Sequence, residues 1–189
     1  MNMKSRAACL AVVCLMGFGA AFGQGSGSRG VDKAPPAETV APAIPGVVKA
    51  GTKVTLIKHG LEGTEGPVTL PDGSLIFTET RGSRITKIDR DDKVSTFLEN
   101  TNRSNGLGFD FKGRLISVQA LTVGVIYPKG SEVVLAGPFE TRPNELVVSS
   151  KDAVYFTLPG AKPPAVYYIP AGGKPVVAAR RLRVLTASN

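Results

Sequence analysis

The fold is decided by three aligned segments: residues 65–78 (EGPVTLPDGSLIFT), residues 105–118 (NGLGFDFKGRLISV) and residues 144–157 (NELVVSSKDAVYFT). Each reads as a short apolar strand, a polar turn and a second apolar strand. Their starts are 40 and 39 residues apart. A constant period of about 40 residues in all-β sequence is typical of a four-stranded propeller blade. The sequence therefore predicts an all-β fold, a β-propeller, with about three blades in this chain.

Two further strands are expected to complete each blade. They are predicted at residues 84–88 and 94–98, at residues 123–127 and 132–135, and at residues 165–169 and 175–178. Turn-forming residues separate the members of each pair. A flat β-sandwich could use strands of this length, but nothing in a sandwich requires the spacing to recur.

The remainder of the chain divides by composition. Lys4 and Arg6 precede an apolar stretch over residues 7–22, followed by small residues, which predicts a signal peptide over residues 1–23. The protein is then exported, to the periplasm or the extracellular space. Residues 24–48, rich in Ala, Pro and Gly, are predicted to form a flexible leader. The partial propeller is assigned to residues 49–178, and residues 179–189 form a basic tail outside the repeat register.

Several protein classes are disfavoured by the sequence. Both cysteines, Cys9 and Cys14, lie in the predicted signal, so no disulfide is expected after cleavage, although an uncleaved anchor or a lipidated Cys14 are alternatives. The formal net charge of +8 is spread along the chain without a dense basic block, which argues against nucleic-acid binding. No segment beyond the signal is apolar enough to span a membrane. His59 is expected in a loop.

Equivalent positions of the repeats suggest a site. Glu65, Asn105 and Asn144 each begin the first strand of a blade, which is the innermost strand of a propeller, so their side chains can converge at one mouth of the central channel. Arg103 and Arg142 are equivalent residues two positions earlier. Carboxylate and amide oxygens suit a hard divalent cation. The alternative is that the asparagines cap turns and Glu65 is a solvated loop residue.

The blade openings resemble those of the gluconolactonase and regucalcin family, also called senescence marker proteins. The similar motifs are Glu65-Gly66-Pro67, residues 103–110 (RSNGLGFD) and residues 142–148 (RPNELVV), followed by residues 153–157 (AVYFT). The resemblance runs over residues 62–178. It implies a six-bladed propeller with a divalent metal at the channel mouth, which hydrolyses sugar lactones or related esters.

The resemblance also implies roles for individual residues. It makes Glu65 and Asn144 metal ligands and Arg142 and Asn105 substrate contacts. It implies Ca²⁺ as the metal, with Mg²⁺, Mn²⁺ or Zn²⁺ as alternatives, and a lactone or sugar acid as the small-molecule partner. Glu145 stands where many members have Asp.

The resemblance assigns no catalytic residue in this chain, because the family draws an Asn and an Asp from later blades. A truncated lactonase, matching only the N-terminal half of the family, is therefore expected. A non-catalytic propeller module that binds a ligand or metal is the alternative function, and self-association of two chains is the route to a complete ring. A product without a stable fold is the third reading.

Overall fold

The computed structural model describes residues 34–180. The predicted signal peptide, residues 24–33 of the predicted leader and residues 181–189 of the predicted tail lie outside this range. All regular elements between residues 34 and 180 are β-strands. No helix in this part of the chain is long and apolar enough to cross a membrane.

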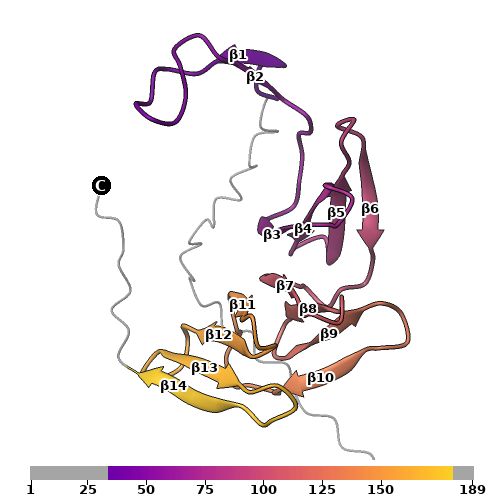
Figure 1. The fold of residues 1–189 in the computed structure, drawn as a ribbon, viewed down its shortest axis with the longest axis vertical. Coiled ribbons are helices and arrows are strands. Elements are labelled where there is room, and N and C mark those ends of the chain that lie inside the picture. Colours follow the sequence, from indigo (N-terminus) through magenta and orange to yellow (C-terminus); the bar gives the residue numbers. More distant parts are fainter. Residues whose placement is uncertain (1–33, 181–189) are drawn as a thin grey trace, which may run out of the picture. The chain divides into compact units, whose positions relative to one another are not determined.

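Three antiparallel four-stranded sheets follow one another along the chain, each a meander of consecutive strands (Figure 1). Blade 1 contains β3 (Thr64–Thr69), β4 (Leu75–Glu79), β5 (Arg84–Ile88) and β6 (Val94–Leu98). Blade 2 contains β7 (Leu107–Phe109), β8 (Leu115–Val118), β9 (Val123–Tyr127) and β10 (Val133–Ala136). Blade 3 contains β11 (Leu146–Val148), β12 (Val154–Leu158), β13 (Ala165–Ile169) and β14 (Val176–Arg180).

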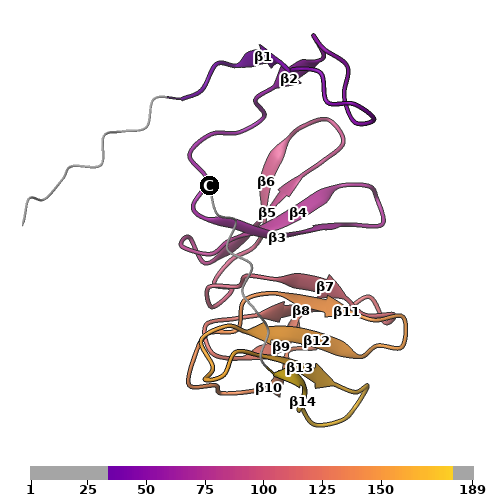
Figure 2. The ribbon, with the colours of Figure 1, turned by 90° about the vertical axis from the view of Figure 1, so that its left-hand side faces the viewer.

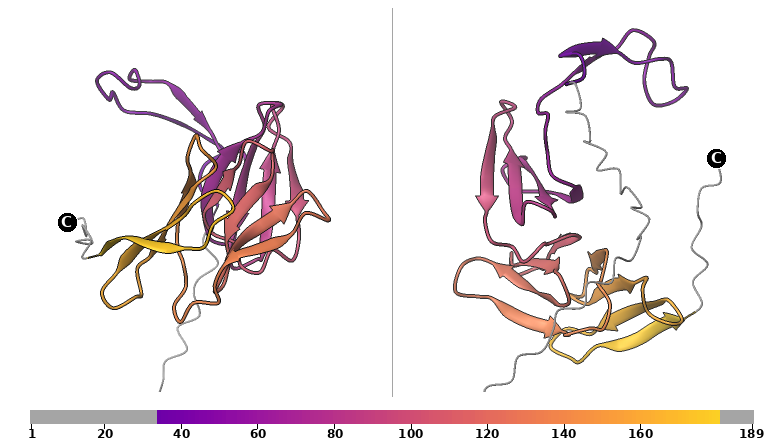
Figure 3. Two further views of the ribbon diagram at one scale, coloured as in Figure 1. Left: turned by 60° about the horizontal axis from the view of Figure 1, so that its bottom comes forward. Right: turned by 180° about the vertical axis from the view of Figure 1, so that it is seen from behind.

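Blade 2 lies between the other two blades, as the view from behind shows (Figure 3, right), whereas blades 2 and 3 overlap in the view of Figure 2. Its first strand, β7, contacts the first strands of both neighbours, β3 and β11. The first strands of the three repeats are therefore adjacent, as they are around the axis of a propeller.

The turn between the first two strands explains the repeated polar segment. Gly73, Gly113 and Asp152 occupy equivalent positions and have φ angles of 83°, 72° and 58°. Glycine adopts this left-handed conformation without steric cost, and aspartate is among the few other residues that visit it readily. The third repeat can therefore replace glycine by aspartate and still close the same turn.

The hydrophobic core lies between the blades. Alternate residues of β8 face opposite sides, so Leu115 packs toward blade 1 while Ile116 packs toward blade 3. The first cluster contains Ile76, Ile85, Leu107 and Leu115. The second contains Ile116, Val118, Val123, Val125, Ala136, Leu146, Val154, Phe156 and Ile169. Burial of these side chains stabilises each blade only in contact with its neighbour.

The strand predictions agree closely with the structure. Strands predicted at 132–135 and 175–178 lie at Val133–Ala136 and Val176–Arg180, and the other predicted outer strands have the predicted bounds. Part of the predicted leader forms β1 (Glu38–Val40), which pairs with β2 (Lys53–Thr55). The first strand of blade 1 begins at Thr64, and β2 pairs with β1 and not with a strand of blade 1.

Candidate metal and substrate site

Asn105 and Asn144, two of the three residues predicted to converge at the channel mouth, meet in the structure. We call their two side chains the amide pair. The Asn105 Nδ2 donates a hydrogen bond of 2.9 Å to the Asn144 Oδ1. The backbone supports this contact, because the Gly106 N–H donates to the Asn144 carbonyl at 3.2 Å. Equivalent positions of blades 2 and 3 therefore converge, as their spacing predicts.

The amide of Asn105 is also left partly unsatisfied. Its side chain is buried, with 7% exposure, and its Oδ1 has no hydrogen-bond partner within residues 34–180. A buried carbonyl oxygen without a hydrogen-bond partner destabilises the fold, and binding a hydrogen-bond donor or a cation would remove this cost. Asn144, whose Oδ1 has a second lone pair, is exposed beside it.

In blades 2 and 3 one residue separates the Arg and Asn positions that precede the first strand, and this residue is buried. Ser104 is fully buried, and its hydroxyl donates to the Thr101 carbonyl at 2.7 Å. Pro143 holds the equivalent buried position in blade 3. The residue between the Arg and Asn positions is therefore buried in both blades.

Glu65 is not brought to the amide pair. Its side chain is exposed and lines a hollow of about 360 Å³ on blade 1 with Leu61, Thr64, Pro67, Leu75, Phe77 and Ile88. Within residues 34–180, no hydrogen bond or ion pair links its carboxylate to Asn105 or Asn144. The backbone next to it does approach blade 2, since a Cβ on Gly66 would lie 2.4 Å from the Asn105 carbonyl oxygen.

Arg142 lies against the equivalent arginine of blade 2. Its Nη2 donates to the Arg103 carbonyl at 2.6 Å, and its buried Nε has no partner in the described chain. Burial and the positive charge of Arg103 lower the pKa of the Arg142 guanidinium from its ordinary value. An anionic or hydroxyl-rich ligand would relieve both effects, because it supplies an acceptor and a compensating charge.

The candidate ligands are of the type that a hard cation prefers, but they are fewer than such a cation usually binds. Asn105, Asn144 and Glu65 offer oxygen ligands, as Ca²⁺ and Mg²⁺ prefer, whereas Ca²⁺ takes about six to eight. Among residues 34–180 there is no cluster of three or more His, Cys, Asp or Glu that could hold a metal. His59 lies in a loop and is exposed.

Sequence reasoning missed two polar features. Thr141, next to Arg142, has a buried hydroxyl without a partner in the described residues. Glu79 is 1% exposed and accepts hydrogen bonds from the Glu62 backbone, the Arg84 guanidinium and the Thr86 hydroxyl. Burial opposes its ionisation, but these donors outweigh burial and lower the pKa of Glu79 from 4.5 to about 2. Neither residue recurs in the other repeats, so periodicity gives no signal for them.

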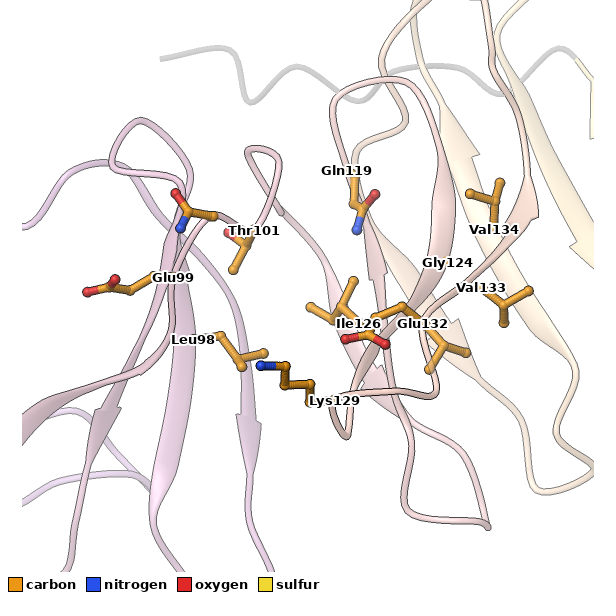
Figure 4. A pocket seen from close by; sticks show the side chains of 12 residues that line it. Leu98, Glu99, Thr101, Gln119, Gly124, Ile126, Lys129, Glu132, Val133 and Val134 are labelled. Atoms are coloured by element: carbon orange, nitrogen blue, oxygen red, sulfur yellow. The ribbon is translucent and has the colours of Figure 1, made fainter.

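A separate hollow lies between the outer parts of blades 1 and 2 (Figure 4). It has a volume of about 470 Å³ and is lined by Leu98 and Thr101 on one side and by Gln119, Ile126 and Glu132 on the other. The amide pair does not line it. We therefore place the candidate site at the blade openings and not in this hollow.

The fold and the converging strand starts define a β-propeller. The structure is similar to a gluconolactonase from Xanthomonas campestris, with a TM-score of 0.60 and 20% identity over 69% of this chain and 52% of that one. It is similar to a structure from a nidogen–laminin complex, with a TM-score of 0.61 and 16% identity over 76% of this chain and 57% of that one. A regucalcin from Agrobacterium tumefaciens, described as a calcium-binding protein, gives a TM-score of 0.52 and 11% identity over 64% and 44%.

These similarities concern the fold. The chain spans about half the length of the solved structures that it matches. No protein-family model and no curated protein sequence matches the chain. The activity of a complete propeller is therefore a proposal for this chain.

Proposed function

We propose that the chain forms part of an exported propeller that hydrolyses sugar lactones or related esters with a bound divalent cation. The Asn105–Asn144 pair carries this proposal, because two amides from equivalent blade openings meet and leave a buried oxygen without a partner. The blade-opening motifs and the propeller fold, which a gluconolactonase shares, add support.

The residues that precede the first strands of the blades would have different roles in binding the cation and the substrate. Asn105, Asn144 and Glu65 would hold the cation through oxygen atoms, with Glu65 turned toward the amides from its present position. The bound cation would polarise the ester carbonyl and lower the pKa of a coordinated water. Arg142 would bind the substrate through its free donors, and the hydrogen bond between the two asparagines would fix their orientation. Ca²⁺ fits an all-oxygen donor set better than Zn²⁺ does.

A binding function without turnover is the second candidate. It is favoured by one observation: within residues 34–180 no carboxylate is hydrogen-bonded to the side chains of Asn105 and Asn144, and the neighbouring Glu145 carboxylate accepts a hydrogen bond from the Leu146 backbone instead. Asn105, Asn144 and Arg142 would then bind a cation or a sugar acid without hydrolysing a substrate.

Lactone hydrolysis by the purified chain separates the two candidates. We expect hydrolysis of a six-membered sugar lactone to be abolished by a chelator and restored by added Ca²⁺. Asn105→Ala and Glu65→Gln should each lower the rate by about tenfold or more. Glu140→Gln, a matched change at an exposed loop residue, should have no effect.

Hydrolysis that persists with chelator and in both site variants would contradict the lactonase proposal. Calorimetry tests the second candidate. Binding of Ca²⁺ or a sugar acid to the wild-type chain but not to Asn105→Ala, without lactone hydrolysis, would support it.

A further inference from the structure

The two end faces of the three-blade array are uncovered among residues 34–180. We call the face of each blade toward the next blade its forward face, and the opposite one its rear face. The forward faces of blades 1 and 2 each pack on the rear face of the following blade. No blade within the described part of the chain covers the rear face of blade 1 or the forward face of blade 3 in this way.

Equivalent residues show how different these end faces are. Ile76 and Ile116 lie on covered forward faces and are 0% and 2% exposed, whereas the equivalent Tyr155 of blade 3 is 38% exposed. On the rear faces, Leu115 and Val154 are 0% and 2% exposed, whereas Leu75 of blade 1, at the same position, is 38% exposed.

Both end faces are largely apolar, although Thr64 and Glu65 also line the hollow on blade 1 and Glu145 and Thr157 the hollow on blade 3. The forward face of blade 3 has a hollow of about 210 Å³ lined by Val147, Tyr155 and Val166, among others. The hollow on the rear face of blade 1 is lined by Leu61, Pro67, Leu75, Phe77 and Ile88. Each face therefore presents the kind of surface that its equivalents bury against a blade of this chain.

We propose that a second copy of this chain covers these faces. The rear face of its blade 1 docks on the forward face of blade 3, and the same contact repeats in the other direction. Three blades from each copy make six, which lies within the range that propellers form. A pair that closes in this way leaves no blade face free, so association stops at the dimer.

One residue limits this contact. Gly66 and Gly106 are equivalent, and the next blade approaches each closely: a Cβ on Gly66 would lie 2.4 Å from a carbonyl oxygen, and one on Gly106 would lie 2.8 Å from the Leu146 nitrogen. Blade 3 has Glu145 at this position. The Glu145 carboxylate lies against Gly106 of blade 2, while the residue also lines the hollow on the forward face. The same docking would bring Glu145 against the partner's Gly66, where blades 1 and 2 have only glycine, and place its charge near the partner's Glu65.

Glu145 therefore weakens the pair, and glycine at this position should strengthen it. Sedimentation velocity over a concentration series tests this with the full chain. We expect a reversible dimer for the wild type and a dissociation constant lowered by about tenfold or more for Glu145→Gly. Glu145→Gln, which keeps the size and removes the charge, should lie between the two.

Charges placed on the end faces identify the contact. Leu75→Glu and Tyr155→Glu should each abolish the dimer, because each damages both junctions. A mixture of these two variants keeps one intact junction and should associate more strongly than either variant alone. Phe111→Glu is the matched control, since Phe111 is 74% exposed but lies on the β7–β8 turn, away from both end faces.

Wild type and Glu145→Gly that both stay monomeric over the series would overturn the proposal. A dimer that survives Leu75→Glu and Tyr155→Glu would overturn it as well, and so would a mixture that shows no recovery. Circular dichroism establishes that each variant is folded. The outcome is independent of lactone hydrolysis, so the assembly and the proposed activity are tested separately.

Discussion

The buried carboxylate of Glu79 should make the stability of blade 1 depend on pH. Its pKa is lowered from 4.5 to about 2, despite burial, by hydrogen bonds from Arg84, Thr86 and the Glu62 backbone. A pKa lower in the folded state stabilises the fold above pH 4.5, and this contribution is lost as the pH falls toward 2. Each pH unit is worth about 1.4 kcal/mol, so the ionised carboxylate contributes about 3 kcal/mol at pH 7.

Urea unfolding of the wild type and Glu79→Gln, followed by circular dichroism, measures this contribution. At pH 7 we expect the variant to be less stable by about 3 kcal/mol. At pH 3 protonation should have removed most of the wild-type advantage and left a difference of about 1 kcal/mol. Glu140→Gln, the same change on the surface, should leave the free energy of unfolding unaltered at both pH values.

A difference between wild type and Glu79→Gln that stays constant from pH 7 to pH 3 would refute this reasoning. The cost of the substitution would then come from shape or lost hydrogen bonds and not from the charge of Glu79. The unfolding slope of the two proteins should agree, since a changed slope would mean that the variant alters the unfolded or folded ensemble itself.

Three further predictions concern stability, each measured by urea unfolding. Gly66→Ala should cost about 2 kcal/mol or more through its clash with the next blade, whereas Gly113→Ala, also at positive φ but with open space around it, should cost only about 1 kcal/mol. Equal losses for the two variants would argue against the close approach. Phe156→Ala, at a fully buried site, should cost about 3–5 kcal/mol, and a loss below about 1 kcal/mol would contradict its place in the core. Asp72→Asn breaks the exposed pair with Lys87, so its small effect should vanish in high salt and a salt-independent loss would count against a screened ion pair.

The blades are predictable from sequence because their turns and strands repeat. Gly73 and Gly113 mark a turn with a fixed conformation, and the apolar residues on each side alternate as strands require. The β1–β2 pair is not predictable in this way. Its residues, Glu38–Val40 and Lys53–Thr55, are exposed, and backbone hydrogen bonds pair the two strands. The sequence therefore has no apolar alternation here that would predict the pair.

The site is predictable only in part, for a related reason. Repeat equivalence fixes where the backbones of Asn105 and Asn144 lie, and their side chains do meet. It does not fix the direction of the Glu65 side chain, because the register of β3 shifts between Glu65 and Val68. A bulge of this kind bends its strand and redirects the neighbouring side chains. The glycine and proline of this segment belong to the bulge, although they also form part of the family-like motif.

Glu145 connects the site to the end of the array. It follows Asn144 directly, and its side chain lies against Gly106, so a change here acts on the amide pair as well as on the junction. Asn105→Ala changes the amide pair without altering either end face. If Glu145→Gly strengthens the dimer and raises hydrolysis, while Asn105→Ala lowers hydrolysis and leaves the dimer intact, then assembly precedes activity. The reverse pattern, hydrolysis by a monomer that no end-face variant affects, would mean that the three blades contain a sufficient site.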